Sequence, residues 1–476
     1  MSSTKTLPLR ETIDALPPIW QRDVLPEINE EIAANPSRLF VLDDDPTGPQ
    51  TVHDVAFLTD WSKEALLSEF RTSERATFIL TNSRSVTQAE AIKINAEVGS
   101  NILLASLELG KPISVISRSD STLRGHFPSE VEALAGALNP DTGYDGLIFI
   151  PFFIEGGRYT VGNVQYSREG HSLVPVAETP FAKDTAFGYK SSNLREWMEE
   201  KYGGRVKARD ISAISIEDIR LGGPSKVQEL LEELRRGEIC IVNAADMRDL
   251  DVVALAVLRA ERLGKKFLFR TSASFVRSRI GQSEQQMLSR DEIASSDEGG
   301  ALILVGSHVR GSTLQLEKVL DIPGMNGIEL DVFKVIDGVP GLIRSIINQV
   351  EEHLSRSEDV TVYTSRELVT GESPEEYLRI GAAVTDAMSA VVAGLSVKPR
   401  YLVSKGGMTS SNVTKNALNM KRALVPGQIF PGVLVLQMGP EAKYPGMRFI
   451  LFPGNVGDPE AIADVVRKMD PSDVGA

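Results

Sequence analysis

The stretch RLFVLDDDPTG, residues 38–48, decides the fold class expected for this chain. Its apolar run Leu39–Leu42 is typical of a parallel strand that helices cover on both faces. Three adjacent carboxylates follow, Asp43, Asp44 and Asp45, and the turn sequence PTG comes next. Because like charges repel and resist burial, this turn indicates a site for a cation or a hydroxyl-rich ligand. In open α/β sheets, ligands bind beyond the carboxyl ends of the strands, where this cluster lies.

Strand-like and helix-like segments alternate along most of the chain, which predicts an α/β fold with largely parallel sheets wound by helices. The expected strands are the apolar runs Leu39–Leu42, Thr77–Leu80, Ile113–Ile116, Gly146–Ile150, Ile239–Asn243, Lys266–Phe269, Ala301–Val305, Gly327–Leu330, Val360–Tyr363, Arg400–Val403, Val433–Gln437 and Arg448–Phe452. The expected helices include Ser129–Leu138, Ser225–Arg236, Asn412–Leu418 and one that runs from an N-cap at Asp251 to Gly264.

The segment Ser283–Gly300 is polar and charged and ends on Gly-Gly, so it predicts a domain boundary. We therefore expect a first domain at residues 1–285 and a second at residues 286–476. Within the first domain, residues 151–215 are rich in Gly, Thr and Tyr and are expected to be irregular or β-rich.

Composition narrows the class of protein. The 476 residues are 42% hydrophobic, enough for sizeable cores, and the net charge of −14 argues against nucleic acid or an anionic membrane as a main partner. The single cysteine, Cys240, lies in an apolar run, so we expect a buried thiol and no internal disulfide. No apolar run is long enough to span a membrane and the first residues lack a signal-peptide core, which favours the cytoplasm. Whether the chain forms a homo-oligomer stays open.

The most polar turn is SRSDSTLRGH, residues 117–126, which follows a predicted strand. Arg118 and Arg124 are candidates to clamp a carboxylate, and Asp120 is a candidate to take or orient a hydroxyl proton. The alternative is a capped turn with an internal Arg–Asp ion pair. Two further turns follow strands: TNSRS with Arg84 as an anion ligand, and PFFIEGGR with Glu155 and Arg158.

In the second half of the chain, the segments after the strands are rich in glycine instead of acids. These segments are Gly306–Ser307, SKGGMTSS at residues 404–411 and PGNVG at residues 453–457. Glycine lets backbone amides approach phosphates closely, so the three segments together predict a nucleotide site. Neither the P-loop pattern nor the dinucleotide pattern G-x-G-x-x-G is present.

Taken in order, these motifs resemble the four-carbon acid sugar kinase family, which is related to threonate, erythronate and 3-oxo-tetronate kinases. The resemblance covers residues 38–460 and rests on Asp44–Gly48, Asn82–Arg84, the specific D-S-T-L-R-G at Asp120–Gly125, Pro151–Arg158, Gly306–Ser307, Gly406–Thr409 and Gly454–Gly457. Three positions depart from the family pattern: Asp43, Pro46, and Met408 where an acid is common. The first two suggest a distinct subgroup whose substrate differs.

The resemblance implies two α/β domains, with an acid sugar bound by the first, ATP by the second and the active site in the interdomain cleft. It implies transfer of the ATP γ-phosphoryl group to a sugar hydroxyl, with Mg²⁺ on the phosphates and no assigned metal ligands. The implied catalytic residues are Asp44, Asp45 and Asp120, with Arg84 and Arg124 on the substrate carboxylate. Further implied substrate contacts are Thr47, Ser121, Thr122, Gly125, Glu155 and Arg158. The implied nucleotide contacts are Ser307, Gly406, Gly407, Met408, Thr409, Gly454 and Asn455.

A haloacid-dehalogenase-type phosphatase is the alternative. An apolar strand followed by Asp43-x-Asp45-x-Thr47-Gly48 also fits the first motif of that class, in which the first Asp is the nucleophile and the second the acid/base. The lysine that this class requires has no convincing position, and SDSTLRGH and GGMTSS stay unexplained under it.

Overall fold

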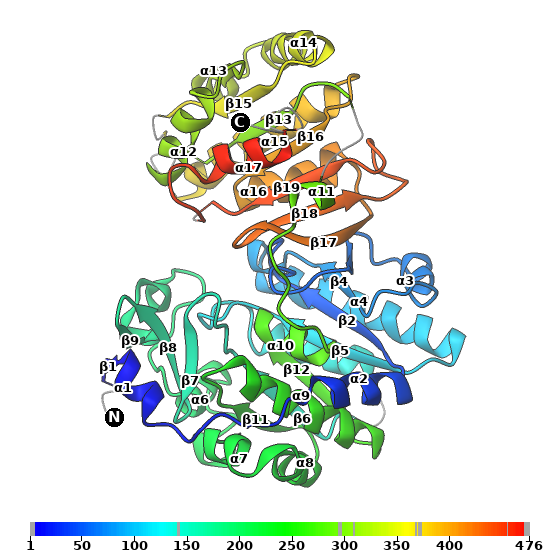
Figure 1. The fold of residues 1–476 in the computed structure, drawn as a ribbon, viewed down its shortest axis with the longest axis vertical. Helices are drawn as coiled ribbons and strands as arrows, with labels where there is room; N and C mark the ends of the chain where they lie inside the picture. The colour runs from blue at the N-terminus through cyan, green and yellow to red at the C-terminus, as the bar shows by residue number, and fades with distance from the viewer. Residues whose placement is uncertain are drawn as a thin grey trace. The chain divides into compact units, whose positions relative to one another are not determined.

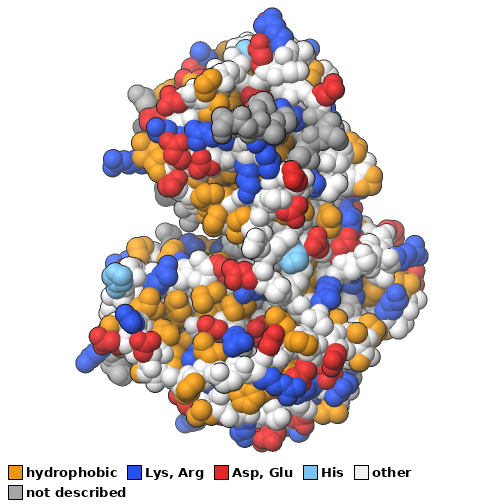
Figure 2. Space-filling model, in the orientation of Figure 1, with side chains coloured by type: hydrophobic (Ala, Val, Ile, Leu, Met, Phe, Trp, Pro, Cys, Tyr) orange, Lys and Arg blue, Asp and Glu red, His pale blue; other side chains and the backbone are white. Residues whose placement is uncertain are grey.

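A computed structural model describes residues 5–139, 143–293, 298–307, 310–366, 369, 374–454 and 456–470, with no side chains described for 374–378. The chain divides into two compact units, which are described separately. Unit 1 comprises residues 1–52 and 61–284, and unit 2 comprises residues 53–60 and 285–476. In Figure 2, acidic and basic side chains are interspersed over the face in view.

Unit 1 is built on a parallel sheet with the strand order β10-β11-β6-β12-β5-β2-β4 (Figure 1). Its strands are β2 (Arg38–Asp43), β4 (Ala76–Leu80), β5 (Ile113–Arg118), β6 (Gly146–Ile150), β10 (Ser212–Ile214), β11 (Glu238–Val242) and β12 (Phe267–Thr271). Nearly every residue of the central strands is buried, as the continuous apolar runs predict for a sheet covered on both faces.

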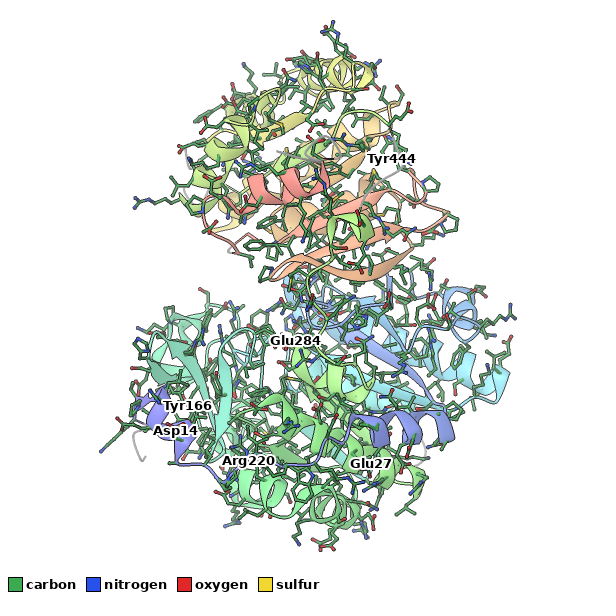
Figure 3. The ribbon with its side chains drawn as sticks, viewed as in Figure 1. Asp14, Glu27, Tyr166, Arg220, Glu284 and Tyr444 are labelled. Carbon is green, nitrogen blue, oxygen red and sulfur yellow. The ribbon has the colours of Figure 1, made fainter. Side chains whose placement is uncertain are left out.

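Two groups of helices cover this sheet. The first group is α3 (Lys63–Glu69), α4 (Gln88–Leu109) and α5 (Ser129–Leu138); the second is α2 (Leu25–Ala34), α7 (Ile216–Arg220), α8 (Gly223–Glu233), α9 (Met247–Arg262) and α10 (Ala273–Arg279). The crossovers β5–α5–β6 and β11–α9–β12 run in opposite directions along the sheet, so right-handed connections put α5 and α9 on opposite faces. Ion pairs attach neighbouring segments to α9: Glu27 of α2 pairs with Arg259 at 2.6 Å, and Arg220 pairs with Asp249 at 2.7 Å (Figure 3).

A small antiparallel sheet, β1-β9-β8-β7, lies within the region expected to be irregular or β-rich, except for its edge strand β1. Its strands are β1 (Leu7–Pro8), β7 (Arg158–Val161), β8 (Val164–Glu169) and β9 (Ser172–Pro175), and α1 (Leu9–Asp14), α6 (Leu194–Lys201) and the 3₁₀ turns η2 (Val176–Glu178), η3 (Pro180–Lys183) and η4 (Ala208–Asp210) accompany it.

Unit 2 has a mixed sheet with the order β3-β17-β18-β19-β16-β13-β15-β14, parallel from β19 to β14. Its strands are β3 (Val55–Leu58), β13 (Leu302–Val305), β14 (Asn326–Leu330), β15 (Val360–Thr364), β16 (Tyr401–Lys405), β17 (Arg422–Phe430), β18 (Val433–Met438) and β19 (Arg448–Phe452). Its helices are α11 (Arg290–Ile293), α12 (Arg310–Leu320), α13 (Val332–Ile336), α14 (Leu342–Ser355), α15 (Pro374–Gly394), α16 (Gly407–Asn412), the π turn η5 (Val413–Ala417) and α17 (Ala461–Met469).

Three expectations need correction. Residues 53–60 belong to unit 2 and not to the first domain, because β3 pairs antiparallel with β17. The cap of α9 is Asp246, whose carboxylate accepts from Arg248 N at 2.9 Å, while Asp251 lies inside the helix. The helix expected at Asn412–Leu418 already begins at Gly407, with Gly406 as its N-cap.

Cys240 is buried, as expected. Among the helices that the structure describes, none combines the length and the apolar character needed to cross a membrane.

Candidate active site

The carboxyl edge of the unit 1 sheet brings the acidic turn and the SDSTLRGH turn together. Asp43, the last residue of β2, lies level with Arg118, the last residue of β5. On its other side, the Asp43 carbonyl accepts the Thr81 amide at 2.9 Å, so the segment after β4 begins at the same height. Parallel pairing in register therefore assembles three sequence motifs at one edge.

Two turns in this assembly have the same local structure. In the sequence Asp45-Pro46-Thr47, the Asp45 carboxylate accepts from Thr47 N at 2.8 Å and Thr47 Oγ1 at 2.5 Å. In Asp120-Ser121-Thr122, the Asp120 carboxylate accepts from Thr122 N at 3.1 Å and Thr122 Oγ1 at 2.5 Å. Each threonine thus fixes the carboxylate two residues before it, a frequent use of Asp in tight turns.

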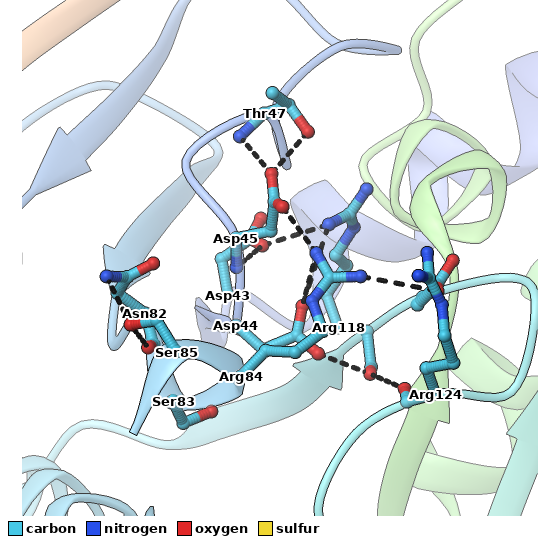
Figure 4. A network of polar contacts seen from close by, with 12 residues as sticks. Asp43, Asp44, Asp45, Thr47, Asn82, Ser83, Arg84, Ser85, Arg118 and Arg124 are labelled. Carbon is cyan, nitrogen blue, oxygen red and sulfur yellow. Dashed lines mark hydrogen bonds and ion pairs between the residues drawn. The ribbon is translucent and has the colours of Figure 1, made fainter. Parts of the chain in front are cut away.

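Arg84 joins the two D-x-T turns. Its guanidinium pairs with Asp45 Oδ2, lies 3.3 Å from Asp120 Oδ2 and lies 3.7 Å from Asp44 Oδ1 (Figure 4). Burial opposes its charge, but the surrounding aspartates outweigh burial and raise the pKa of Arg84. Arg84 is therefore an internal counter-ion for three carboxylates.

Asp43 is the deepest of the three consecutive aspartates. It is fully buried, Arg118 Nη1 donates to its Oδ1 at 3.0 Å, and no donor among the described residues contacts its Oδ2. A Cβ at Gly48 would lie 1.1 Å from that Oδ2, so the turn closes over the carboxylate only with glycine at position 48. Burial raises the pKa of Asp43 to about 7, although Arg118 opposes the shift.

Asp44 lies between the two turns. Its Oδ2 accepts from Ser119 Oγ at 2.5 Å, and Arg270 of β12 donates to the same hydroxyl at 2.8 Å. Burial raises the pKa of Asp44 despite the nearby Arg84. Gly125, with φ of +128°, passes so close that a Cβ there would lie 2.9 Å from Arg270 and 3.0 Å from Ser119 Oγ.

The two aspartates of the D-x-T turns have the opposite electrostatic character. Burial also opposes ionisation of Asp45 and Asp120, but Arg84 and the hydrogen bonds from Thr47 and Thr122 outweigh it and lower the pKa of both. At neutral pH these two carboxylates are ionised and accept hydrogen bonds, which suits them to orient hydroxyl groups of a ligand.

The arginines expected to hold a carboxylate differ in their surroundings. Arg118 is buried against Asp43, so it does not face a ligand. Arg124 forms the internal pair with Asp120 at 2.7 Å that the alternative reading of this turn predicts, and its guanidinium lies 5.0 Å from the ring centroid of Phe181. Arg158 lies 5.3 Å from the same centroid. No carboxylate of the described residues comes within 4.0 Å of Arg158, so its charge is available to an anion.

A hollow opens beside Asp120 and Arg124. Its other lining residues are Ser119, Leu123, Phe127, Phe149, Pro151, Trp197, Arg270 and Thr271. Glu155 turns away from the cluster, since it accepts from Ser274 Oγ at 2.8 Å and pairs with Arg277 at 3.3 Å. Ser121 is buried, and its carbonyl accepts from Gln165 at 2.8 Å.

In unit 2, the expected glycine segments converge at the carboxyl edge of the sheet. A Cβ at Gly306 would lie 2.4 Å from Thr409 Oγ1, one at Gly406 3.9 Å from Ser307, and one at Gly454 4.0 Å from Gly406. These contacts bring Ser307, Gly406, Thr409 and Gly454 together. Gly407 and Met408 lie in the first turn of α16, where Met408 is 73% exposed, and Asn455 lies outside the described residues.

Several polar residues at these two edges were missing from the expectations. Ser119, Glu130 and Arg270 support the aspartates of unit 1: Arg270 pairs with Glu130 at 2.6 Å, and Glu130 accepts from Ser83 at 2.8 Å. In unit 2, Lys405 and Arg366 donate to backbone carbonyls of the glycine segments. Charged residues placed one or two positions beyond an apolar run are the signal that would have found Arg270 and Lys405.

The carboxylates do not form a ready metal site. No group of three or more His, Cys, Asp or Glu side chains among the described residues is arranged to hold a metal ion. Asp43, Asp45 and Asp120 are each engaged by an arginine, which leaves this donor set a poor match for the oxygen cage that Mg²⁺ prefers.

Two family models match the chain. A sugar-binding N-terminal domain matches residues 39–279, and a nucleotide-binding C-terminal domain matches residues 302–462. A D-erythronate kinase from Heliobacterium modesticaldum (strain ATCC 51547 / Ice1) is 28% identical over 178 residues. That alignment spans 37% of this chain and 36% of the relative.

Solved structures share the fold. A Haemophilus influenzae protein superposes with a TM-score of 0.63 at 19% identity, covering 88% of this chain and 97% of that one. A Salmonella typhimurium LT2 protein superposes with a TM-score of 0.67 at 17% identity, covering 91% and 100%. With the matched domain pair and the arrangement of the DDDPTG and DSTLRG turns, these findings show that the chain belongs to the four-carbon acid sugar kinase family.

Proposed function

We propose that this protein is an ATP-dependent kinase that phosphorylates a hydroxyl group of a small acid sugar with about four carbons, such as threonate, erythronate or 3-oxo-tetronate. The observation that carries the proposal is the pair of D-x-T turns joined by Arg84, which holds two ionised carboxylates in fixed positions. The comparisons support it, since one relative is a D-erythronate kinase and the second domain is of a nucleotide-binding type.

Asp120 is the residue that we assign to the attacking hydroxyl, because it lines the hollow and is ionised at neutral pH. Asp45 orients a second hydroxyl, and Asp44 lies behind both. Phosphoryl transfer depends mainly on positioning and charge neutralisation, so a carboxylate of low pKa is sufficient to orient the nucleophile. Mg²⁺ enters with the phosphates of ATP as part of that substrate.

Arg158 and Arg124 are the residues that we assign to the substrate carboxylate. Arg84 is held among three aspartates, whereas Arg158 has no described carboxylate within 4.0 Å. Arg124 pairs with Asp120 at 2.7 Å and Asp184 at 3.6 Å but lies with Arg158 on the Phe181 ring, so Arg158 supplies the unpaired charge and Arg124 flanks it. This assignment replaces Arg84 by Arg158 in the expected clamp.

Transfer also requires the γ-phosphoryl group bound by unit 2 to reach the hydroxyl bound by unit 1. The interdomain cleft expected from the family resemblance stays part of this proposal. Ser307, Gly406, Thr409 and Gly454, which meet at the edge of the unit 2 sheet, are the residues that we assign to the phosphates.

The phosphatase alternative meets an obstacle at its nucleophile. Asp43 would have to attack a substrate phosphorus atom, but it is fully buried, paired with Arg118 and covered by Gly48. A nucleophile needs access to the reacting atom, so the kinase is the better explanation of this geometry.

The test compares D-erythronate with erythritol, which lacks the carboxylate, in an ADP-release assay with MgATP. Wild type should use the acid and not the polyol. Arg158→Met should raise KM for the acid roughly 10–100-fold, the value of a charge-assisted contact, and leave KM for ATP unchanged. The control Arg71→Met changes an exposed arginine in the turn after α3 and should have no effect. Equal KM values for the acid in Arg158→Met and wild type would remove Arg158 from the clamp.

A further inference from the structure

Lys405 is a fully buried lysine at the end of β16, between the glycine segments of unit 2. Its Nζ donates to the Pro453 carbonyl at 2.8 Å and to the Val456 carbonyl at 3.0 Å, and it lies 4.1 Å from the centroid of the Phe452 ring. No carboxylate of the described residues lies within 4.0 Å of it. Among the described residues, two carbonyl dipoles and an aromatic face stabilise its charge.

Such a charge is costly without an anion. Burial lowers the pKa of Lys405 to about 8, with no opposing contribution from an acid. Buried charges in proteins are normally paired or bound to a ligand of opposite sign. The geometry around Lys405 therefore indicates that a negatively charged group completes this site when it binds.

The two carbonyls also set the direction of two amides. In a trans peptide group the C=O and the N–H point in opposite directions. Lys405 draws the carbonyls of Pro453 and Val456 inward, so the amides of the following residues, Gly454 and Gly457, point away from the lysine. Gly457 is exposed and has φ of +85°, and Gly454 is next to Gly406.

Other side chains fix the same segment from the inside. Gln315 Nε2 donates to the Val456 carbonyl at 3.0 Å and to the Asp458 carbonyl at 2.8 Å. Ser312 Oγ contacts the Gly454 carbonyl at 3.4 Å. Carbonyls that are bound on the inner side leave the amide side of the segment for an anion, the arrangement of a backbone anion nest.

We propose that Lys405 is a positioning residue of the nucleotide site, which orients the Gly454 and Gly457 amides toward the phosphates and supplies buried positive charge behind them. This inference rests on the proposed binding of ATP by unit 2. It concerns a residue that does not itself have to touch the nucleotide.

The test measures binding of MgADP and of D-erythronate to the full-length chain by calorimetry. Lys405→Met should weaken MgADP at least tenfold and leave the affinity for the acid sugar unchanged. Lys443→Met is the matched control: this lysine also donates to two carbonyls, those of Val392 and Ala393, and lies 5.3 Å from an aromatic ring, that of Tyr444. It should leave both affinities unchanged.

Hydrogen exchange separates positioning from a loss of folding. In wild type, MgADP should protect the peptide that contains residues 453–458. Lys405→Met should lose this protection while β19 keeps its slow exchange. Lys405→Gln keeps a donor without the charge, so an intermediate MgADP affinity is expected.

The outcomes are distinguishable. If wild type binds no adenine nucleotide, the proposed function fails. If wild type binds MgADP and Lys405→Met binds it equally well, or if β19 exchanges fast in Lys405→Met, the positioning role is wrong and the lysine has only a structural role.

Discussion

The three consecutive aspartates of the DDDPTG turn have different chemical roles because they have different neighbours. Asp43 is buried against Arg118 and Gly48, Asp44 shares the Ser119 hydroxyl with Arg270, and Asp45 is fixed by Thr47 and Arg84. Only Asp45 has a lowered pKa, whereas burial raises the pKa of the other two. Because each aspartate has its own partners and only one of the three has a lowered pKa, three consecutive acidic residues are tolerated at one strand end.

Asp43 predicts a pH dependence of stability. Its pKa of about 7 in the folded chain exceeds the ordinary value of 3.8, so the folded state binds the proton more tightly than the unfolded state. The stabilisation is complete below the ordinary value and is lost as pH rises through 7. The asparagine of Asp43→Asn cannot ionise, so the variant does not lose this stabilisation. The free energy of unfolding of Asp43→Asn relative to that of wild type should therefore rise by roughly 2–4 kcal/mol between pH 4 and 8.

Urea denaturation at several pH values provides the measurement. Asp321→Asn, which changes an exposed carboxylate just beyond α12, should show a constant difference from wild type over the same range. A constant difference for Asp43→Asn as well would mean that Asp43 stays ionised throughout this range and that its pKa is not raised.

At the scale of elements, the strand ends separate what the sequence predicts from what it does not. The apolar runs locate most strands, and Gly146–Ile150 and Arg448–Phe452 match the structure at both ends. Three strands run two residues further than expected: β5 to Arg118, β12 to Thr271 and β16 to Lys405. The pattern ends a strand at a polar or charged residue, but here those residues are buried: Arg118 binds Asp43 of β2, Arg270 binds Ser117 of β5, and Lys405 binds carbonyls of the segment after β19.

The positions of the candidate site residues were predictable from the sequence, but the partners of its arginines were not. D-x-T, S-R and D-S-T-L-R-G locate the acidic residues, because polar side chains after parallel strands meet at one edge. The roles of Arg84, Arg118 and Arg158 were not predictable, since they depend on which carboxylate each guanidinium reaches. The strand β3, the short apolar run Val55–Leu58, was missed, and its place in unit 2 was not predictable because its partner β17 lies more than 350 residues later in the chain.

The SDSTLRGH turn predicts a crowding effect at Gly125. A Cβ there would lie 2.9 Å from Arg270 and 3.0 Å from Ser119 Oγ, in a backbone region that L residues rarely adopt. Gly125→Ala should therefore displace the Ser119–Asp44 contact and lower kcat/KM about 100-fold or more, as a 1 Å misplacement does. Steady-state kinetics provide the measurement.

Gly110→Ala is the control for backbone strain. Gly110 also has a positive φ, of +60°, but nothing lies within 4 Å of its Cβ position. Its substitution should cost about 1 kcal/mol of stability and leave kcat/KM unchanged. If Gly125→Ala and Gly110→Ala have the same kinetics, crowding at the aspartates is not what requires glycine at position 125.

At the scale of the whole molecule, the two units are not consecutive in the chain. Residues 53–60 leave unit 1 directly after the DDDPTG turn, contribute β3 to the unit 2 sheet and return at Trp61. The acidic turn of unit 1 is therefore followed directly in the chain by β3, a strand of unit 2. The sugar-binding family model matches residues 39–279 without a break, although residues 53–60 within that range belong to unit 2 in the structure.

Because β3 belongs to unit 2, a destabilising substitution in β3 should affect unit 2 and not unit 1. Phe57 of β3 and Phe78 of β4 are each 1% exposed, but they belong to different units. Phe57→Ala should cost about 3–5 kcal/mol, the usual value for a buried phenylalanine, and should speed hydrogen exchange in residues 301–452. Phe78→Ala should speed exchange within residues 76–271 instead. Faster exchange only in unit 1 for Phe57→Ala would contradict the assignment of β3 to unit 2.

We have proposed that the chain transfers a phosphoryl group from ATP to an acid sugar. The most direct measurement is ³¹P NMR of the full-length protein with MgATP and D-erythronate, D-threonate or a 3-oxo-tetronate, with Asp120→Asn in parallel. We expect a new phosphomonoester signal that appears with ADP in equal amounts, and a rate roughly 10²–10⁴-fold lower for Asp120→Asn. ATP left intact in the presence of every small acid sugar, or inorganic phosphate released from sugar phosphates without ATP, would contradict it.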